Sequence, residues 1–408
     1  MLEDRTPLWT RSFLAVCLSS FFVFLTFYIL AVTLPLFVTG ELGAPEERIG
    51  LVMTAFIVST VCVRPLAGRW MDQYDRKKIF AGSLLLFFVC TAAYHAIHSF
   101  WPLIALRFVH GIGFGLAATA GGAAAADLVP ERRKGEGIGY YSLFMSLAMV
   151  VGPFIGLTVA NRYSPTSLFA LCGVFSALAL LCGLALRLPE RRKPAPGDAP
   201  ASGLRRYFEP AALPVSGTAA LLAFAYGAIT TFLSVYAVDL GYASYASYFF
   251  AVFAAAIVFS RPATGRWFDR FGANALVYPG VALFAGGMIW LSAVQSPAAF
   301  LLSGAVVGLG FGALLPSLQT LAVQSAPRHR AGIATGTFFV LFDSGYGIGS
   351  YVLGVAAAHA GYRGMYLIGG LVVACMAGVY YVWVHRRSQR GSRLSAAPAK
   401  PNNTQEGF

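Results

Sequence analysis

Asp343 is the only acidic residue that the sequence places near the middle of an apolar stretch long enough to cross a membrane. Burial disfavours the charged form of a carboxyl group, and the loss of a neighbouring cation disfavours it further. Such a group can take up and release a proton as a substrate moves past it. We therefore predict that Asp343 is a proton carrier. The alternative is that Asp343 is the permanent partner of an arginine or a hydrogen-bond acceptor at a helix end.

Three arginines also lie within apolar stretches. Arg107 lies near the centre of its stretch, where an arginine costs roughly 2.5–3.5 kcal/mol on insertion scales. We predict that Arg107 faces a polar cavity or an acidic partner and takes part in proton coupling with Asp343. Arg64 and Arg261 lie about 12 Å inside the aspartates that follow their stretches, at 1.5 Å per helical residue. We expect these two side chains to reach the membrane interface and to be structural.

The composition indicates that helices in lipid position these residues. Hydrophobic residues make up 57% of the 408-residue chain and charged residues 12%, against about 45–50% and about 25% in soluble domains. About 20 apolar residues cross a bilayer core, and twelve stretches reach that length. They lie near residues 12–38, 49–71, 79–98, 101–127, 136–160, 164–187, 211–237, 246–268, 275–294, 296–321, 331–357 and 364–384.

The formal net charge of +13 would favour nucleic acid as the partner of a soluble protein. In this chain the basic residues follow the positive-inside rule instead. Apart from the three arginines within spans, only Arg48, Arg162 and Arg363 lie outside the tails and the alternate loop regions that begin with the amino terminus. Both termini are therefore predicted to be cytoplasmic in a plasma membrane, such as the inner membrane of a bacterium. Nucleic acid is not an expected partner.

The sequence Arg-Pro-x-x-Gly-Arg-Trp-x-Asp occurs at residues 64–72 and again at residues 261–269. The two copies are 197 residues apart (261 − 64). With this spacing further glycines align without a gap, among them Gly111, Gly113 and Gly115 with Gly308, Gly310 and Gly312. A segment rich in proline, glycine and charge at 187–210 separates the two copies and is predicted to be a cytoplasmic linker. A six-span unit ends on the side where it began, so both copies have the same orientation.

We therefore predict an all-α membrane protein with twelve transmembrane helices in two six-helix bundles related by a parallel repeat. The bundles comprise residues 1–186 and 211–384, and the polar tail 385–408 is predicted to be disordered in the cytoplasm. In a parallel repeat a substrate site lies between the halves, near the midplane of the membrane.

The segment Gly68-x-x-x-Asp72-x-x-x-Arg76-Lys77 follows the second span and resembles the loop signature of the major facilitator superfamily. Two positions depart from the signature, because Gln73 and Asp75 stand where a basic residue and a glycine are usual. The resemblance implies a membrane transporter in which Arg76 bridges Asp72 and Asp127. We interpret these residues, and Asp269 in the second copy, as a cytoplasmic gate. The alternative is that they are solvated charges that only set the topology.

Two further motifs resemble this superfamily. Leu103-x-x-Leu106-Arg107 is similar to its second signature, although His110 follows where glutamine is frequent. The fifth span contains Gly139, Gly152-Pro153 and Gly156 and resembles the signature of the twelve-span drug and proton antiporters. That resemblance implies export, with a bend at Pro153 and close contact of the small residues across the halves. A Gly-Pro bend that serves packing alone is the alternative.

Aromatic and polar residues recur on spans that line the cavity in this superfamily, and they suit an amphipathic organic substrate. The alternative is that they pack against lipid or other helices. The predicted cavity residues are Phe27, Tyr28, His110, Tyr226, Thr230, Tyr236, Gln319, Phe342 and Tyr346.

These observations favour a monomeric secondary transporter that exports a small organic molecule in exchange for protons. Uptake by proton symport or facilitated diffusion is the second hypothesis, and a membrane sensor that binds a ligand without transporting it is the third. An enzyme is not expected, because the loops offer no nucleophile with a base and no Gly-Lys-Ser/Thr nucleotide site. No cofactor is expected, and His95 and His98 lack further ligands for a metal.

Overall fold

The computed structural model describes residues 8–130, 133–188, 208–327 and 330–386. The described residues form helices joined by short turns, and no strand occurs among them. The long helices are α1 (Arg11–Gly40), α2 (Ile49–Gln73), α3 (Arg76–Ala93), α4 (Phe100–Leu128), α5 (Lys134–Arg162), α6 (Pro165–Leu184), α7 (Leu213–Asp239), α8 (Ala246–Phe271), α9 (Asn274–Ser292), α10 (Pro297–Gln324) and α11 (Ala331–Tyr380). Short helical turns are η2 (Glu46–Arg48), η3 (Tyr94–Ala96), η6 (Ala243–Tyr245) and η8 (Tyr381–His385).

Local sequence explains where several helices begin. Thr10 caps α1, because its hydroxyl accepts a hydrogen bond from the Phe13 amide at 3.1 Å. Ser164 and Ser296 cap α6 and α10, and each is followed by a proline at the first helical position. Proline is favoured there because its missing N–H would have no helical partner. Inside each helix the backbone groups bond to one another, as a lipid environment requires.

Eleven helices in the described part of the chain are long and apolar enough to cross a membrane. The last of them, α11, contains two predicted spans. Gly361 interrupts it with φ 69° and ψ 171°, so two helical segments meet at a kink with hardly any loop between them. A positive φ carries no steric penalty in glycine, which explains how the predicted loop at 358–363 shrinks to one residue.

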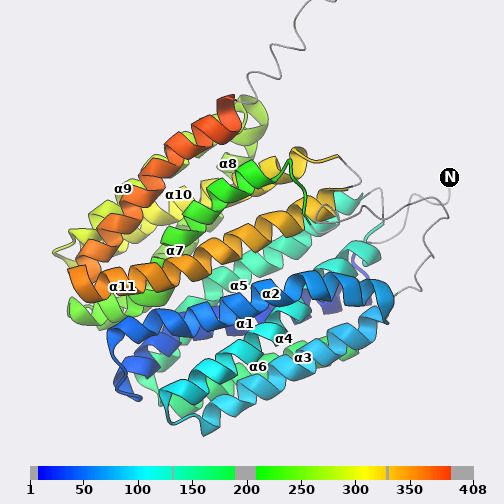
Figure 1. Cartoon of the computed structure of the whole chain (residues 1–408), viewed down its shortest axis with the longest axis horizontal. Helices are drawn as coiled ribbons and strands as arrows, with labels where there is room; N and C mark the ends of the chain where they lie inside the picture. The colour runs from blue at the N-terminus through cyan, green and yellow to red at the C-terminus, as the bar shows by residue number, and fades with distance from the viewer. Residues whose placement is uncertain (1–7, 131–132, 189–207, 328–329, 387–408) are drawn as a thin grey trace, which may run out of the picture.

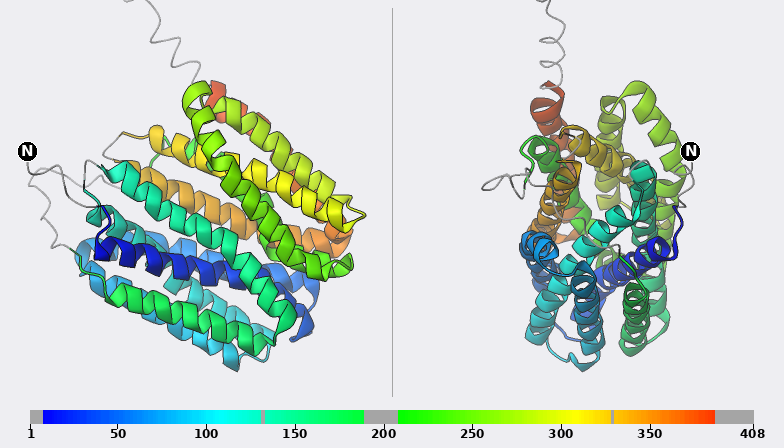
Figure 2. Two further views of the ribbon diagram at one scale, coloured as in Figure 1. Left: turned by 180° about the vertical axis from the view of Figure 1, so that it is seen from behind. Right: turned by 90° about the vertical axis from the view of Figure 1, so that its right-hand side faces the viewer.

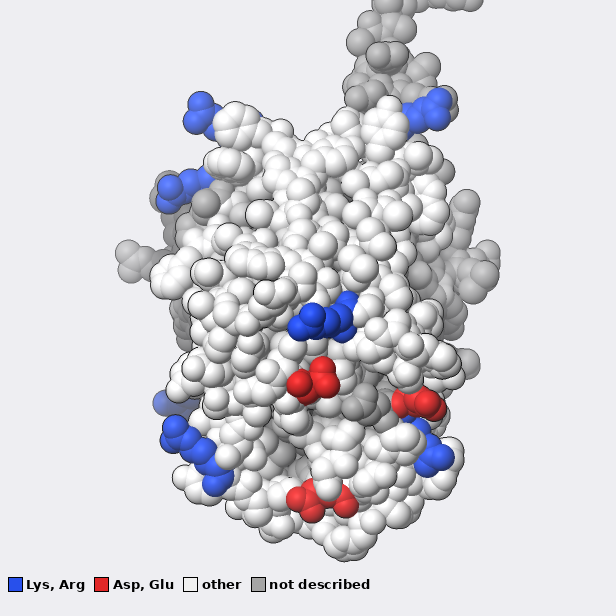
Figure 3. All heavy atoms as spheres, turned by 90° about the vertical axis from the view of Figure 1, so that its left-hand side faces the viewer, with Lys and Arg blue, Asp and Glu red and all other residues white. Residues whose placement is uncertain are grey.

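The helices run up and down, so their ends gather at two ends of the molecule. We call one the basic end, because Arg76, Lys77, Lys78, Arg187 and Arg330 lie there, near the ends of α2, α4 and α6 and the starts of α3, α7 and α11. The opposite far end holds the turns η2, η3 and η6 and the kink at Gly361. Figure 3 shows a face at the far end, on which the few charged side chains are scattered over an otherwise uncharged surface.

The helices α1–α6 form a first group and α7–α11 a second group (Figure 1). Within the first group α1 packs against α5 and α6, and α2 against α4; within the second, α7 packs against α11, and α10 against α8 and α9. The groups meet mainly where α1 packs against α7, α2 against α11 and α5 against α8, and α2 also touches α7. Figure 2 shows the same two groups from behind and from the side.

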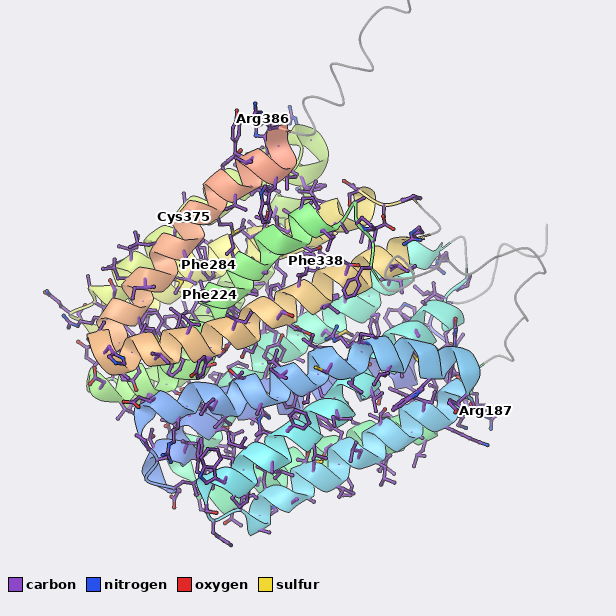
Figure 4. All side chains as sticks on the ribbon, in the orientation of Figure 1. Arg187, Phe224, Phe284, Phe338, Cys375 and Arg386 are labelled. Carbon is purple, nitrogen blue, oxygen red and sulfur yellow. The ribbon has the colours of Figure 1, made fainter. Side chains whose placement is uncertain are left out.

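Glycines set the spacing between helices inside each group. A Cβ atom on Gly111 of α4 would lie 2.2 Å from the carbonyl oxygen of Phe56 on α2, and one on Gly113 would lie 3.0 Å from the Phe87 amide on α3. In the second group, Gly308 of α10 stands in the same relation to Phe253, and Gly310 to Phe284. Figure 4 labels Phe284 on α9, within this packed layer. The glycine-rich stretch of α4 is therefore a packing surface.

Close contacts join α2 and α11 toward the far end. Thr54 donates a hydrogen bond to the carbonyl of Gly347 at 3.0 Å. A Cβ atom on Gly50 would lie 2.4 Å from the carbonyl oxygen of Ser350. Ser234 of α7 likewise donates to Val32 of α1 at 2.9 Å. The two groups are thus joined by backbone contacts at the far end, where glycine permits close approach.

Gly50→Ala tests this contact. The added methyl group would overlap the Ser350 carbonyl and force α2 and α11 apart, a kind of overpacking that costs roughly 1–3 kcal/mol. We expect the Tm of the purified protein in detergent to fall. Gly82→Ala is the matched control, because Gly82 is also helical and has no atom within 4 Å of the added Cβ. Equal Tm values for the two variants would contradict the predicted overlap.

Candidate functional site

Asp343 forms an ion pair with Arg64 between the two groups of helices. The Arg64 Nη2 atom on α2 lies 2.6 Å from the Asp343 Oδ2 atom on α11. The two side chains are only 16% and 17% exposed, and Arg64 Nε and Asp343 Oδ2 are buried, so the pair is largely shielded from solvent in this conformation. The atoms are close but not aligned as a hydrogen bond, and Arg64 Nε has no hydrogen-bond partner among the described residues.

The expected position of Arg64 was wrong. Its side chain does not extend to the end of α2 but turns across the boundary between the groups to reach Asp343. A buried carboxylate attracts a cation more strongly than the interface does, because charges interact strongly where water is scarce. The side chain of the repeat-related Arg261 lies outside the described residues.

Tyrosine side chains surround the pair. Asp343 acts electrostatically on Tyr28 of α1 and on Tyr346, one turn further along α11. The Thr230 hydroxyl on α7 is hydrogen-bonded to the Tyr346 hydroxyl at 2.8 Å, and the ring centroid of Tyr226 lies 6.1 Å from that of Tyr346. Tyr28, Tyr226, Thr230 and Tyr346, all predicted cavity residues, therefore gather near the ion pair.

Phe342 is half-buried beside Asp343 and stacks on Phe338, which Figure 4 labels on α11. The Arg64 Cζ atom lies 6.0 Å from the ring centroid of Phe339, within cation–π range. Aromatic rings therefore cover the ion pair on the α11 side.

Arg107 lies elsewhere, fully buried inside the first group. Its guanidinium lies 4.1 Å from the ring centroid of Phe56, and its Nε donates to the Val52 carbonyl at 3.3 Å. Its Nη1 donates to the Tyr94 hydroxyl at 3.3 Å. No acidic residue pairs with it among the described side chains, so the expected acidic partner was wrong. The π-face of Phe56 and neutral acceptors stabilise this cation instead.

Tyr94 joins Arg107 to His110 in one hydrogen-bonded chain. Arginine can only donate, so the Tyr94 hydroxyl accepts from Arg107 and donates to His110 Nδ1, 3.1 Å away. His110 Nε2 then carries a hydrogen for Thr91, whose hydroxyl donates to the Phe87 carbonyl. When His110 is neutral, each donor and acceptor in this chain of side chains has a hydrogen-bond partner. His110 is buried in the core of the first group, so its expected place in a cavity between the groups was wrong.

With the fold and the ion pair described, the chain can be compared with known proteins. The model of the Major Facilitator Superfamily matches residues 16–350. The chain belongs to this superfamily. It is therefore a membrane transporter and not an enzyme.

Several transporters resemble this superfamily member along most of their length. The staphylopine export protein of Staphylococcus aureus is 25% identical over 352 residues, covering 82% of this chain and 86% of that protein. An uncharacterized transporter of Burkholderia mallei is 27% identical and covers 96% and 95%. A bacterial homolog of the human lysosomal transporter Spinster has the same fold, with a TM-score of 0.79, 15% identity, and coverage of 95% and 99%.

The loop after α2 makes the contact that the superfamily resemblance implies. Arg76, at the start of α3, forms an ion pair with Asp127, at the end of α4. Asp75 departs from the family signature because it caps α3, accepting from the Lys77 amide at 2.8 Å. Both paired residues belong to the first group, and their gating role stays a prediction. The contacts of Gly68, Asp72, Gly139 and Asp269 lie outside the described residues.

The small residues of α5 contact a different neighbour from the one predicted. A Cβ atom on Gly152 would lie 2.7 Å from the Cβ of Tyr28, and one on Gly156 would lie 3.1 Å from Ile29. Both neighbours are on α1, in the same group. The expectation of close contact across the halves was therefore wrong for Gly152 and Gly156, which let α5 approach α1 beside Pro153.

The other predicted cavity residues are Tyr236, Phe27 and Gln319. Tyr236 is buried in the second group and donates to the Leu291 carbonyl near the far end. Phe27 stacks on Phe56 and Phe114 in the core of the first group. Gln319 is half-buried on α10. Of these, Tyr236 and Phe27 are packing residues.

The sequence did not indicate that Arg64 pairs with Asp343, that Tyr94 binds Arg107, or that a further ion pair forms at the basic end. Glu209 pairs with Arg330 at the basic end, and its amide donates to the Thr337 hydroxyl at 2.9 Å. This contact ties the segment before α7 to the first turns of α11. Nothing in the spacing of the sequence indicated it.

Tyr94→Phe tests the buried chain in the first group. Removing the hydroxyl leaves Arg107 Nη1 and His110 Nδ1 without their shared partner, and an unsatisfied buried group costs roughly 1–3 kcal/mol. We expect a clear fall in Tm in detergent. Tyr74→Phe is the control, because Tyr74 is 65% exposed. The chain would be energetically unimportant if both variants denatured at the wild-type temperature.

Proposed function

We propose that this transporter exports a small organic molecule in exchange for protons, by alternating access between the two sides of a plasma membrane. The observation that carries the proposal is the Arg64–Asp343 ion pair, which joins helices of different groups. Movement of one group against the other changes the distance between the two charges. The protonation of Asp343 is then linked to the conformation of the transporter.

We further propose twelve crossings, counted with α11 as two spans that meet at Gly361, and a parallel repeat of two bundles with a cytoplasmic linker. The matched glycine contacts of α4 with α2 and of α10 with α8 support the repeat. The many lysines and arginines at the basic end support cytoplasmic termini. With that orientation, the far-end contacts close the outer side in this conformation.

The cycle follows from this arrangement. With the outer side closed, Arg64 lies beside Asp343, and an adjacent cation favours the ionised carboxylate, so a proton leaves to the cytoplasm. Substrate then binds between the groups, and rocking of the loaded transporter exposes Asp343 to the outside, where the substrate leaves and a proton neutralises the carboxylate. Arg76 and Asp127 brace the cytoplasmic ends of α3 and α4 as part of the gate. The staphylopine export protein, 25% identical to this chain, supports export of a small molecule.

Asp343→Asn tests proton coupling. Inside-out vesicles that carry the protein are acidified within, and a dye reports the pH gradient while a panel of small organic molecules is added. We expect some compounds to dissipate the gradient with the wild type and none to do so with Asp343→Asn, because asparagine cannot carry the proton.

Asp239→Asn is the control, because Asp239 is an exposed carboxylate at the end of α7 and should leave the response unchanged. A full response in Asp343→Asn would remove Asp343 from the mechanism. Accumulation of the same compounds inside intact cells would show uptake in place of export.

A further inference from the structure

We propose that the Arg64–Asp343 pair recognises a small molecule that carries both a carboxylate and an ammonium group. The ligand carboxylate forms an ion pair with Arg64, and the ligand ammonium forms an ion pair with Asp343. These two contacts replace the one that the side chains make with each other. This inference rests on the proposed transport function and names its substrate class.

The geometry of the pair leaves hydrogen-bonding capacity unused. Arg64 Nη2 lies 2.6 Å from Asp343 Oδ2, and Arg64 Nε has no hydrogen-bond partner among the described residues. A guanidinium group binds a carboxylate best through two parallel hydrogen bonds. The Nε and Nη2 edge of Arg64 can offer that fork to a ligand, while the present contact with Asp343 does not use it. In this conformation Arg64 Nε and Asp343 Oδ2 are buried, so a ligand reaches them when the two groups of helices part.

Electrostatics favours a ligand with both charges. An anion that paired with Arg64 would leave Asp343 as an unpaired carboxylate in a poorly hydrated place. A cation that paired with Asp343 would leave Arg64 without a counter-charge. Removing one partner of a buried ion pair is strongly destabilising. A ligand without charge would leave the pair intact and gain little from it. A zwitterion exchanges one ion pair for two.

The surrounding side chains fit the rest of such a molecule. Phe339 lies near the Arg64 guanidinium, and Tyr28 and Tyr346 lie within electrostatic range of Asp343. Aromatic faces attract an ammonium group and cover an apolar body. The Tyr346 hydroxyl is hydrogen-bonded to Thr230 and adds a polar group beside these aromatic faces.

The same carboxylate explains how a proton would displace this substrate. Asp343 can hold a proton or pair with the ligand ammonium, and a protonated carboxyl group offers no charge to the ammonium. Binding of the ligand and of the proton is therefore mutually exclusive at this side chain. The position on α5 that corresponds to Asp343 in the repeat is Ser146. The first group therefore has no carboxylate there for which a proton and a ligand would compete.

Four probes of one shape test the charge requirement: phenylalanine, phenylalaninamide, N-acetylphenylalanine and N-acetylphenylalaninamide, which are zwitterionic, cationic, anionic and neutral. Their Kd values are measured by calorimetry on the full chain in detergent at neutral pH. We expect phenylalanine to bind the wild type at least roughly tenfold more tightly than the other three, a difference of about 1.4 kcal/mol. Preference for another form, or binding of none, overturns the proposal.

Single variants should change the preferred charge. Asp343→Asn leaves Arg64 alone and should favour N-acetylphenylalanine, whereas Arg64→Gln leaves Asp343 alone and should favour phenylalaninamide. The double variant should lose both preferences. Asp239→Asn and Arg162→Gln, which change exposed charges elsewhere, should keep the wild-type order. An unchanged order in the pair variants would assign recognition to other residues.

The binding measurement needs no proton gradient, so it separates the two proposals. If the preferred ligand charge changes in the pair variants but the vesicles show no proton coupling, the zwitterionic ligand class is supported and antiport is rejected. Proton coupling that depends on Asp343, with selectivity that ignores the variants, would keep antiport and reject the ligand class.

Discussion

The structure depends on one electrostatic constraint, which is that opposite charges buried between membrane helices must stay together. Arg64 and Asp343 belong to different groups of helices and lie 2.6 Å apart. In a poorly hydrated environment either charge alone is unfavourable. The position of α2 against α11 therefore decides the energy of both side chains. A rearrangement of the two groups that parts them has to supply a proton, a ligand or water in exchange.

Backbone contacts hold α2 at the height that this pair requires. On one side Gly111 and Gly115 let α4 approach α2 until backbone meets backbone, and on the other Gly50 lies against Ser350 of α11. Arg107 adds a hydrogen bond to the Val52 carbonyl, in the first turn of α2. The two intramembrane arginines thus act on the same helix at different heights. Arg107 ties α2 to its own group, while Arg64 ties it to the other.

The sequence predicted the helical membrane fold, the family and the intramembrane acid, but it did not indicate which arginine pairs with Asp343. Helix rise offers a reason to prefer Arg64, since Asp343 lies about 18 Å from the start of α11, and Arg64 and Arg107 lie about 14 and about 32 Å from the basic ends of their helices. Depth does not reveal which face a side chain occupies, however. The same limit applies to Gly152 and Gly156, because small residues show that a helix approaches closely without showing which neighbour it meets.

The difference between the two copies also bears on stoichiometry. By the proposed repeat, Arg64 corresponds to Arg261 and Asp343 to Ser146. Of these two corresponding positions, only the one at Asp343 carries a carboxylate. One carboxylate holds one proton at a time, and a second acid at the mirrored position would repel the first and raise the cost of an empty site. A single acid therefore suits the exchange of one proton per cycle, because Arg64 neutralises the carboxylate in one conformation and a proton neutralises it when the two charges part.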